Sequence, residues 1–588
     1  MNEKSKSIWK KSLTGWRGLL LGWLILMVAL AIILLIWLIA MRTPVARSGD
    51  ELRLFGVIGV AVTAIFLLVS FIRWVFCGRN FKRFLFGLAC FATLIALFYA
   101  EEDWRGWHAW NQFKHAWEAK GEHFDFASVI PPAVPDEQNF ALTPVVASCY
   151  EYILDKNGHR LEKQNTNIVN RLDFDLGDRD LFTNGIGNWA KGTASSLKSY
   201  QAHYRELAAK TNLFAVPPTP QSPAADVLLA LSKYDATVEE LRQASLLPQC
   251  RFPLNYDTEY PGAILLPHLA AMKTLSQLLH LRALAELQNG QSDQALADVQ
   301  LSLRLTETIR TEPFLISHLV RIALWHITLQ PVYEGLAEHR WSDAQLAALD
   351  AELAKLDFLA DYQLSMRGEL GMQGGLFEYL RRHPEEIINL SGEYDSKALP
   401  FPARIVWKMI PNGFFYQNQL HCARPLVEFY LPAADVSQQT ISPSATRHAD
   451  EVVSVETITG TPYNLIERML VPSLGAATKK FAYTKSTVDL ARTAIALERC
   501  RLAHGEFPEA LAALAPQFIA QVPHDVIGGQ PLKYRRTSDG QFVLYSVGWN
   551  ETDDGGVVIN QKSRDRWDES SSRVDISQGD WVWRYPAK

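Results

Sequence analysis

The stretch G-L-L-L-G-W-L-I-L-M-V-A-L-A-I-I-L-L-I-W-L-I-A-M, residues 18–41, contains no charged side chain. A helix rises about 1.5 Å per residue, so a run of this length can cross a hydrocarbon layer about 30 Å thick. The run ends on large residues, and more apolar segments follow it, which is not the pattern of a cleaved signal peptide. The sequence therefore predicts a retained membrane anchor near the N-terminus.

Two further apolar runs follow, at residues 54–72 and 84–100. The second run has the length of a span, whereas the third is at the short end of the window of roughly 17 to 25 residues. We therefore predict an anchor over residues 1–100 that contains two or, preferably, three transmembrane helices. The compartment of everything that follows depends on whether the third run crosses.

Basic residues near the ends of spans are retained on the cytoplasmic side during insertion. They are Lys4, Lys6, Lys10, Lys11 and Arg17 before the first span, Arg42, Arg47 and Arg53 in the first loop, and Arg73, Arg79, Lys82 and Arg83 before the third. This distribution predicts a cytoplasmic N-terminus. Three spans then place the C-terminal region outside the cytoplasm, and two spans would leave it inside.

A tryptophan-rich helix and a proline spacer are predicted at residues 101–135. Trp107, Trp110, Phe113 and Trp117 fall on one helical face at 100° per residue. Indole rings favour the lipid headgroup level, so we predict that these four side chains lie at the membrane interface and contact lipid. The alternative is that this stripe packs on the soluble region. The sequence I-P-P-A-V-P, residues 130–135, then predicts a stiff extended spacer.

Composition limits the classes of function. The chain has 588 residues and a net charge of −5, so two or three units are expected outside the membrane. No polybasic field is present, which argues against nucleic acid as a partner. Six cysteines are too few for a disulfide scaffold. Cys149, Cys250, Cys422 and Cys500 lie outside the anchor and leave both options open, up to two bridges or buried reduced thiols.

The soluble region begins with an irregular mixed segment, residues 136–263. The string Asp173, Asp175, Gly177, Asp178, Asp180 invites comparison with a calcium loop, but an EF-hand needs Gly at position six and Glu at position twelve. A solvated acidic turn is the better interpretation. Residues 361–479 mix short helical stretches with proline and glycine breaks, and no fold is predicted for them.

Residues 264–360 read as an α-helical region. Leucines spread around most of one helix that ends at Asn289 and Gly290, which predicts a largely buried helix, and a second helix follows. Ser342 with Gln345 forms a capping box that predicts a third helix start. The Gly290 junction is similar to that of a tetratricopeptide (TPR) hairpin, but no second copy occurs at a 34-residue period. We expect TPR-like hairpins rather than a true array.

Residues 480–588 carry the most specific pattern. A helix over about 484–502 leads into G-E-F-P, and two strands, P-L-K-Y-R-R and Q-F-V-L-Y-S-V-G, are joined through Asp539 and Gly540. Asp-Gly between alternating apolar runs is a hairpin signal. The sequence predicts a small α/β module with an antiparallel β-hairpin.

This module resembles the core of the major pseudopilin of type II secretion, general secretion pathway protein G. The similar elements are R-L-A-H-G-E-F-P (501–508), P-H-D-V-I-G-G-Q-P-L-K-Y-R (523–535), L-Y-S-V-G (544–548), a D-D-G-G loop (553–556) and Asp575-Ile576. The whole chain is also similar to uncharacterised bacterial multi-span membrane proteins that end in such a module. The resemblance implies a bacterial inner-membrane protein with a periplasmic domain.

The module departs from the family in its helix, which carries Lys485, Asp489, Arg492, Glu498 and Arg499. Such a helix cannot be the apolar core of a fibre, so the chain is not predicted to be a pilus subunit. Pseudopilins of this type bind calcium in the last loop, and the resemblance therefore implies Asp553, Asp554 and Asp575 as calcium ligands. The alternative is an Asp-Gly turn closed by hydrogen bonds.

No catalytic motif with a recognisable spacing is found, and no catalytic or cofactor-binding residue is assigned. His268, His280 and His318 sit in apolar helical patterns, as core histidines do, and His524 beside Asp525 is interpreted as part of a turn. We expect a non-enzymatic, membrane-anchored assembly or interaction protein of the bacterial envelope with protein partners there, linked to type II secretion-like machinery. Two alternatives stay open, a membrane-anchored hydrolase with its site in 140–260 or 365–475, and a ligand-sensing membrane protein.

Overall fold

The structure is a computed structural model, and it describes residues 63, 69, 78–149, 171–177, 181, 185–211, 213–391, 407–458, 460–471, 474–561 and 574–586. The predicted spans at 18–41 and 54–72 therefore lie outside the described residues, apart from two isolated positions. The chain divides into two compact units, Met1–Glu101 and Glu102–Lys588. All the soluble segments predicted above, from 136 to 588, belong to the second unit.

The described part of the first unit is the beginning of helix α4 (Gly78–Glu118), which continues without a break into the second unit. Over Phe81–Glu118 this helix contains an 18-residue window with a mean hydropathy of 1.9 and no buried residue. It is the one helix among the described residues that is long and apolar enough to cross a membrane. It includes the third predicted span, 84–100.

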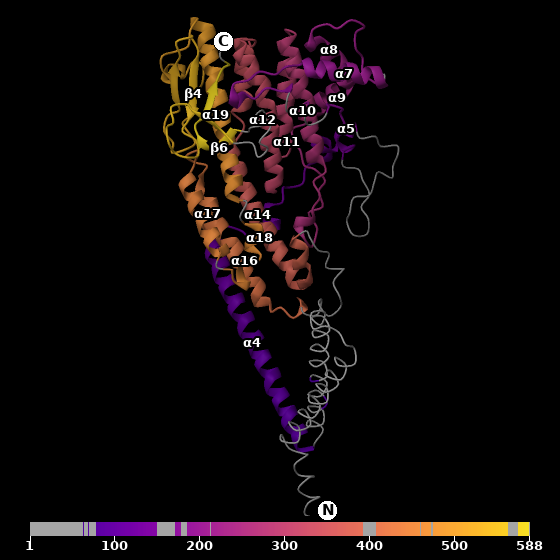
Figure 1. Cartoon of the computed structure of the whole chain (residues 1–588), viewed down its shortest axis with the longest axis vertical. Coiled ribbons are helices and arrows are strands. Elements are labelled where there is room, and N and C mark those ends of the chain that lie inside the picture. Colours follow the sequence, from indigo (N-terminus) through magenta and orange to yellow (C-terminus); the bar gives the residue numbers. More distant parts are fainter. Residues whose placement is uncertain are drawn as a thin grey trace, which may run out of the picture. The chain divides into compact units, whose positions relative to one another are not determined.

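The second unit is mostly helical, and Figure 1 shows its helices in the order of the sequence colours. The helices from the first half are α5 (Pro144–Ala147), α7 (Lys198–Thr211), α8 (Pro223–Leu231), α9 (Asp235–Ala244), α10 (His268–Gln288), α11 (Ser292–Thr308) and α12 (Leu315–Ala337). Those from the second half are α13 (Asp343–Leu353), α14 (Phe358–Arg382), α16 (Asn412–Pro425), α17 (Pro443–Ile458), α18 (Glu467–Leu470) and α19 (Leu474–His504). Helices α7 to α9 were not predicted from the sequence.

Helices α10, α11 and α12 pack against one another, and α12, α13 and α14 pack on α19. The predicted boundary between the first two is confirmed, since α10 ends at Gln288 with cap Asn289 and Gly290 has a φ of +79°. The capping box is also confirmed, because both of its hydrogen bonds, between Ser342 and Gln345, are present. Helix α10 is buried on nearly all sides, as its evenly spread leucines predicted.

The C-terminal strands form small antiparallel sheets. Strand β4 (Phe542–Ser546) pairs with β3 (Lys533–Arg536) on one side and with β7 (Trp581–Arg584) on the other, so that Leu544 lies opposite both Tyr534 and Trp583. The predicted hairpin is thus confirmed. Strands β5 (Val558–Asn560) and β6 (Val574–Gly579) form a second ribbon, and β1 (Ala434–Asp435) and β2 (Thr440–Ile441) form a third.

Helix α19 is longer than predicted and joins the module to the helices. It contacts β4, β6 and β7 as well as α12, α13 and α14. Its charged side chains are paired inside the unit: Lys485 with Asp489, Arg492 with Asp350, Arg499 with Asp343, and Arg501 with Glu498. Arg492 and Arg499 therefore bind this helix to α13, whereas the other two pairs lie within α19 itself.

Candidate functional site

Some of the aromatic side chains of α4 pack on the second unit, and others are exposed to solvent. Trp110 is only 6% exposed, and its ring meets Phe124 edge-on at 5.3 Å, while Phe113 and Trp117 pack on the same core. Trp110 thus packs on the soluble unit, as in the alternative interpretation, whereas Phe113 and Trp117 are half-buried and their contact with lipid stays a prediction. Trp104 and Trp107 are 63% and 50% exposed. Contact of Trp107 with lipid stays a prediction.

The part of α4 that belongs to the second unit, from Glu102 on, makes close backbone contacts with α16. A Cβ atom added to Gly106 would lie 2.5 Å from the Gly413 carbonyl oxygen, and one added to Gly413 would lie 2.1 Å from the Glu102 carbonyl oxygen. The Asp103 carboxylate accepts a hydrogen bond from the backbone N–H of Gly413 (2.8 Å), at the start of α16. A carboxylate at a helix N-terminus is stabilised there because the first N–H groups have no partner within the helix.

A buried polar group completes this attachment. Glu102, 3% exposed, accepts hydrogen bonds from the Arg105 guanidinium and from the Tyr463 hydroxyl (3.2 Å). Arg105 also donates to Tyr463 (3.1 Å). The first turn of α4 in the second unit is therefore joined to α16 and to the short helix η12 (Pro462–Asn464) by hydrogen bonds as well as by close packing.

The three aspartates predicted as calcium ligands are engaged by other groups. Asp553 accepts from the Tyr545 hydroxyl (3.0 Å) and lies 3.2 Å from Lys533 Nζ, Asp554 accepts from the Asn550 amide, and Asp575 accepts from the backbone of Ser577. Hydrogen bonding to the Gly555 N–H and the nearby Lys533 lower the pKa of Asp553. Among the described residues, no three His, Cys, Asp or Glu side chains come together as a metal site.

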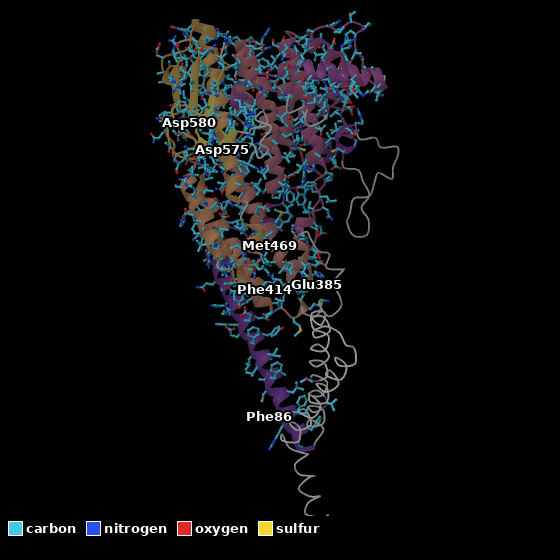
Figure 2. All side chains as sticks on the ribbon, viewed as in Figure 1. Phe86, Glu385, Phe414, Met469, Asp575 and Asp580 are labelled. Atoms are coloured by element: carbon cyan, nitrogen blue, oxygen red, sulfur yellow. The ribbon has the colours of Figure 1, made fainter. Side chains whose placement is uncertain are left out.

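The D-D-G-G loop is instead closed by Asp580, which the sequence analysis did not single out. Its carboxylate, 1% exposed, accepts from the backbone N–H groups of Asp554 (3.2 Å), Gly556 (2.6 Å) and Val557 (3.3 Å). Figure 2 marks Asp575 and Asp580 in this C-terminal part. The loop is thus a turn closed by hydrogen bonds to a buried carboxylate, and calcium binding by Asp553, Asp554 and Asp575 stays a prediction.

His268, Glu312 and Ser317 form a buried cluster with the three residue types of a hydrolase triad. Their arrangement differs from that of a triad. His268 Nε2 lies 2.7 Å from Glu312, and the Ser317 hydroxyl donates to the same carboxylate. In a nucleophilic triad the histidine must accept the serine proton, with the carboxylate on its far side. Here both groups bind the carboxylate, all three residues are buried, and Phe252 stacks on His268. The cluster therefore does not have the arrangement of a catalytic triad.

The other histidines noted in the sequence are also core or turn residues. His280 and His318 are buried, as predicted. Asp525 accepts hydrogen bonds from the backbone of Ile527 and Val547 and from the Ser546 hydroxyl, while His524 bonds the carbonyl of Gln438. The adjacent pair therefore points to different partners, and its interpretation as part of a turn is confirmed.

An aromatic cavity is the strongest candidate for a binding site in the described part of the chain. It has a volume of about 310 Å³ and is lined by residues 186–190 and by side chains from α10, α12, α19 and β6. The rings of Trp189, His326 and Tyr483 are nearly parallel, with interplanar angles of 3° to 20° and centroids 5.4 to 6.4 Å apart. No lining residue is charged.

Polar groups hold the cavity wall in place. The Gln330 side chain accepts from the Trp189 N–H (2.6 Å) and donates to Glu334 (2.7 Å), and Glu334 accepts from both the backbone and the hydroxyl of Ser195. Burial raises the pKa of Glu334. This network holds the loop that carries Trp189 against α12, and the Trp189 side of the cavity is thereby fixed in position.

The histidines of the cavity are neutral. Burial lowers the pKa of His280 to about 4 and that of His326 to about 4. His280 Nδ1 donates to the Ile327 carbonyl (2.5 Å), and His326 Nε2 lies 3.2 Å from the Thr484 hydroxyl. A cavity with neutral rings and no charged lining suits an uncharged guest.

The neutral state of His280 predicts a pH dependence of stability. The unfolded chain takes up a proton on this residue near pH 6.5, whereas the folded protein resists it until about pH 4. The stability contributed by the neutral ring is thus complete above pH 6.5 and falls as the pH is lowered toward 4. We expect the free energy of unfolding of wild type, relative to His280→Leu, to decrease over this window.

The measurement is urea unfolding followed by tryptophan fluorescence at a series of pH values, for both proteins in the same detergent. The comparison removes the contributions of other titrating groups, which the two proteins share. A difference between wild type and variant that stays constant from pH 7 to pH 4 would show that His280 is not held neutral.

Comparison with known proteins returns no relatives: no protein-family model, no curated protein and no solved structure matches this chain. The fold and site define a mostly helical protein with a helix able to cross a membrane and an aromatic cavity in its soluble unit. The resemblance of residues 480–588 to the pseudopilin core, which was read from sequence motifs, stays a prediction. The cavity itself has no sequence signal, since Trp189, His326 and Tyr483 are far apart along the chain.

Proposed function

We propose that this protein is a membrane-anchored assembly or interaction protein of the bacterial envelope that is not an enzyme. The observation that carries the proposal is the continuity of α4, whose apolar part is fully exposed and whose segment from Glu102 to Gly106 lies in close backbone contact with Gly413 of α16. An anchor that is only a tether needs no such attachment. Close backbone packing of this segment within the second unit favours a rigid surface for a protein partner.

The C-terminal module supports the same proposal. In this protein its helix α19 is part of the core of the helical unit. The Glu498 carboxylate accepts hydrogen bonds from Nε (2.8 Å) and Nη2 (2.7 Å) of Arg501 and lies 2.9 Å from His339 Nδ1. We propose that the pseudopilin-like module is a fixed docking surface in the periplasm, which acts with type II secretion-like machinery and does not enter a fibre.

Topology and partners test the proposal together. Alkaline phosphatase fused to the C-terminus is active only outside the cytoplasm, and we expect activity, with an inactive fluorescent-protein fusion as its complement. Crosslinking in intact cells is then expected to recover a specific envelope protein with wild type and less of it with Gly413→Val, which disturbs the attachment of α4. Cytoplasmic fluorescence, or no specific partner for wild type, would contradict the proposal.

Ligand binding in the aromatic cavity is a second candidate function, and the parallel rings of Trp189, His326 and Tyr483 favour it. A flat, uncharged molecule would stack on these rings, which stabilises a complex by about 1 kcal/mol per ring. We expect indole, used as a probe, to bind the protein in nanodiscs and Tyr483→Ala to weaken binding about fivefold.

The control for this test is Val436→Ala, which truncates a half-buried side chain lining a separate groove on the second unit. Titration calorimetry against empty nanodiscs measures both variants. Equal affinity of Tyr483→Ala and wild type, or equal losses in the two variants, would remove the cavity from consideration as a ligand site.

A further inference from the structure

Four exposed apolar side chains occur near the point where α4 enters the second unit. Trp104 and Trp107 lie on α4 itself, Met409 precedes α16, and Leu465 follows η12. Met409 is 57% exposed and Leu465 is 39% exposed. Single exposed apolar residues are common on proteins, but several in one place mark an interaction surface.

The contacts of α4 show why residues so distant in sequence lie near one another. Met409 is four residues from Gly413, whose backbone touches Glu102. Leu465 is two residues from Tyr463, whose hydroxyl reaches Glu102 and Arg105. Each segment is therefore joined to the first turn and a half of α4 beyond Glu101.

Basic side chains accompany this apolar group. Lys408 and Arg468 are exposed neighbours of Met409 and Leu465, and Lys408 lies 3.7 Å from Glu385. Figure 2 marks Glu385 and Phe414 in this region of the second unit. Long basic side chains beside tryptophan and aliphatic residues are typical of protein surfaces at the headgroup level of a membrane, where the apolar stem is buried and the charge meets phosphate.

The distance along α4 identifies the occupant. Counted from the end of the predicted span at Ala100, Trp104 is displaced by about 6 Å and Trp107 by about 10 Å, at about 1.5 Å per residue. The interfacial zone on each side of the hydrocarbon is several ångströms thick, and helix tilt shortens these displacements along the normal. Side chains attached to this part of α4 are thus within reach of the headgroups.

We propose that Trp104, Trp107, Met409 and Leu465 form a membrane footing, the surface by which the second unit rests on the lipid bilayer that α4 leaves. The footing differs from the tryptophan stripe predicted from the sequence, because Trp110 is buried, Phe113 and Trp117 are half-buried, and two segments from elsewhere in the chain are included. The proposal rests on the proposed membrane span of α4, and its test separates the two.

The test uses the full chain in nanodiscs of phosphatidylethanolamine and phosphatidylglycerol. The photo-crosslinking residue p-benzoylphenylalanine is placed at position 409, at position 91 on the apolar part of α4, and at position 246 after α9. Phe91 and Leu246 are both exposed, so these are matched positions for the span and for a surface of the second unit without the footing. Lipid adducts are counted by mass spectrometry after illumination.

We expect lipid adducts at 91 and 409, and at least about tenfold fewer at 246, because only side chains in the interfacial zone meet lipid throughout illumination. Adducts at 91 with none at 409 would overturn the footing while the span stands. Capture of a second copy of the chain at 409 in place of lipid would overturn it as well. No adduct at 91 would overturn the span, and the footing with it.

Discussion

Replacing Arg321 with methionine is expected to lower the free energy of unfolding by about 3 to 5 kcal/mol, the usual cost of removing one partner from a buried ion pair. Arg321 is completely buried in α12. Its guanidinium donates to Asp361 (2.7 Å), to the Thr306 carbonyl (2.7 Å) and to Glu307 (2.8 and 2.9 Å). Methionine fills similar space but leaves the Asp361 carboxylate, which is only 3% exposed, without its cation.

The state of Asp361 sets the size of this effect. Burial raises its pKa to about 7, while Arg321 opposes that rise. Without the arginine, the pKa of Asp361 rises further, and the carboxyl takes up a proton at neutral pH. Protonation avoids a buried unpaired charge, so it limits the loss in the free energy of unfolding. Glu307, at the edge of the bundle, can turn toward Arg310 and solvent.

The control is the double variant Arg321→Met, Asp361→Leu, which removes both buried charges. We expect it to be more stable than the single variant, because an apolar pair replaces an ion pair at little cost. Urea unfolding followed by tryptophan fluorescence measures all three proteins. A single variant that loses less than about 1 kcal/mol, or a double variant that is no better, would show that the pair is not required.

Substitution of Gly368 by alanine is the second large effect that we expect, a loss of about 3 kcal/mol or more from overpacking. A Cβ atom at this position of α14 would lie 1.5 Å from the carbonyl oxygen of Pro313. Backbone cannot rotate away as a side chain does, so the helix or the Pro313 segment must move. The intrinsic preference of alanine for helix, up to about 1 kcal/mol, does not offset this.

Glu378→Ala is the matched control, because it is an alanine substitution at an exposed position on the same helix. We expect it to change the free energy of unfolding by no more than about 0.5 kcal/mol. Thermal unfolding in detergent compares the two. If both variants unfolded at the temperature of wild type, the close approach of Pro313 to α14 would be wrong.

Some elements followed directly from local sequence. The apolar helix around residues 84–100, the end of α10 at Asn289, the capping box at Ser342 and the hairpin of β3 and β4 were all predicted, and the structure shows each of them. Each depends on residues within a few positions of one another. Side-chain periodicity, a cap or a turn residue is therefore enough to specify them.

The glycines of α14 were misinterpreted when only local sequence was considered. The sequence analysis took the glycines after residue 365 as breaks, whereas α14 runs unbroken through them. Gly368, Gly371 and Gly374 are instead the places where Pro313, Phe126 and Phe124 approach the helix. A glycine in a helix costs stability on its own, so only the segment packed against it explains its presence.

The sequence by itself determined that this chain has an apolar helix of membrane-spanning length over 84–100, a helical middle region and a C-terminal β-hairpin. Only the tertiary structure decided that Trp110 faces protein, that Asp580 closes the D-D-G-G loop, and that Trp189, His326 and Tyr483 meet in one cavity. The physical reason is the range of the interactions. Periodicity and capping act within a helical turn or two, whereas burial and hydrogen bonding join residues that only the folded chain brings together.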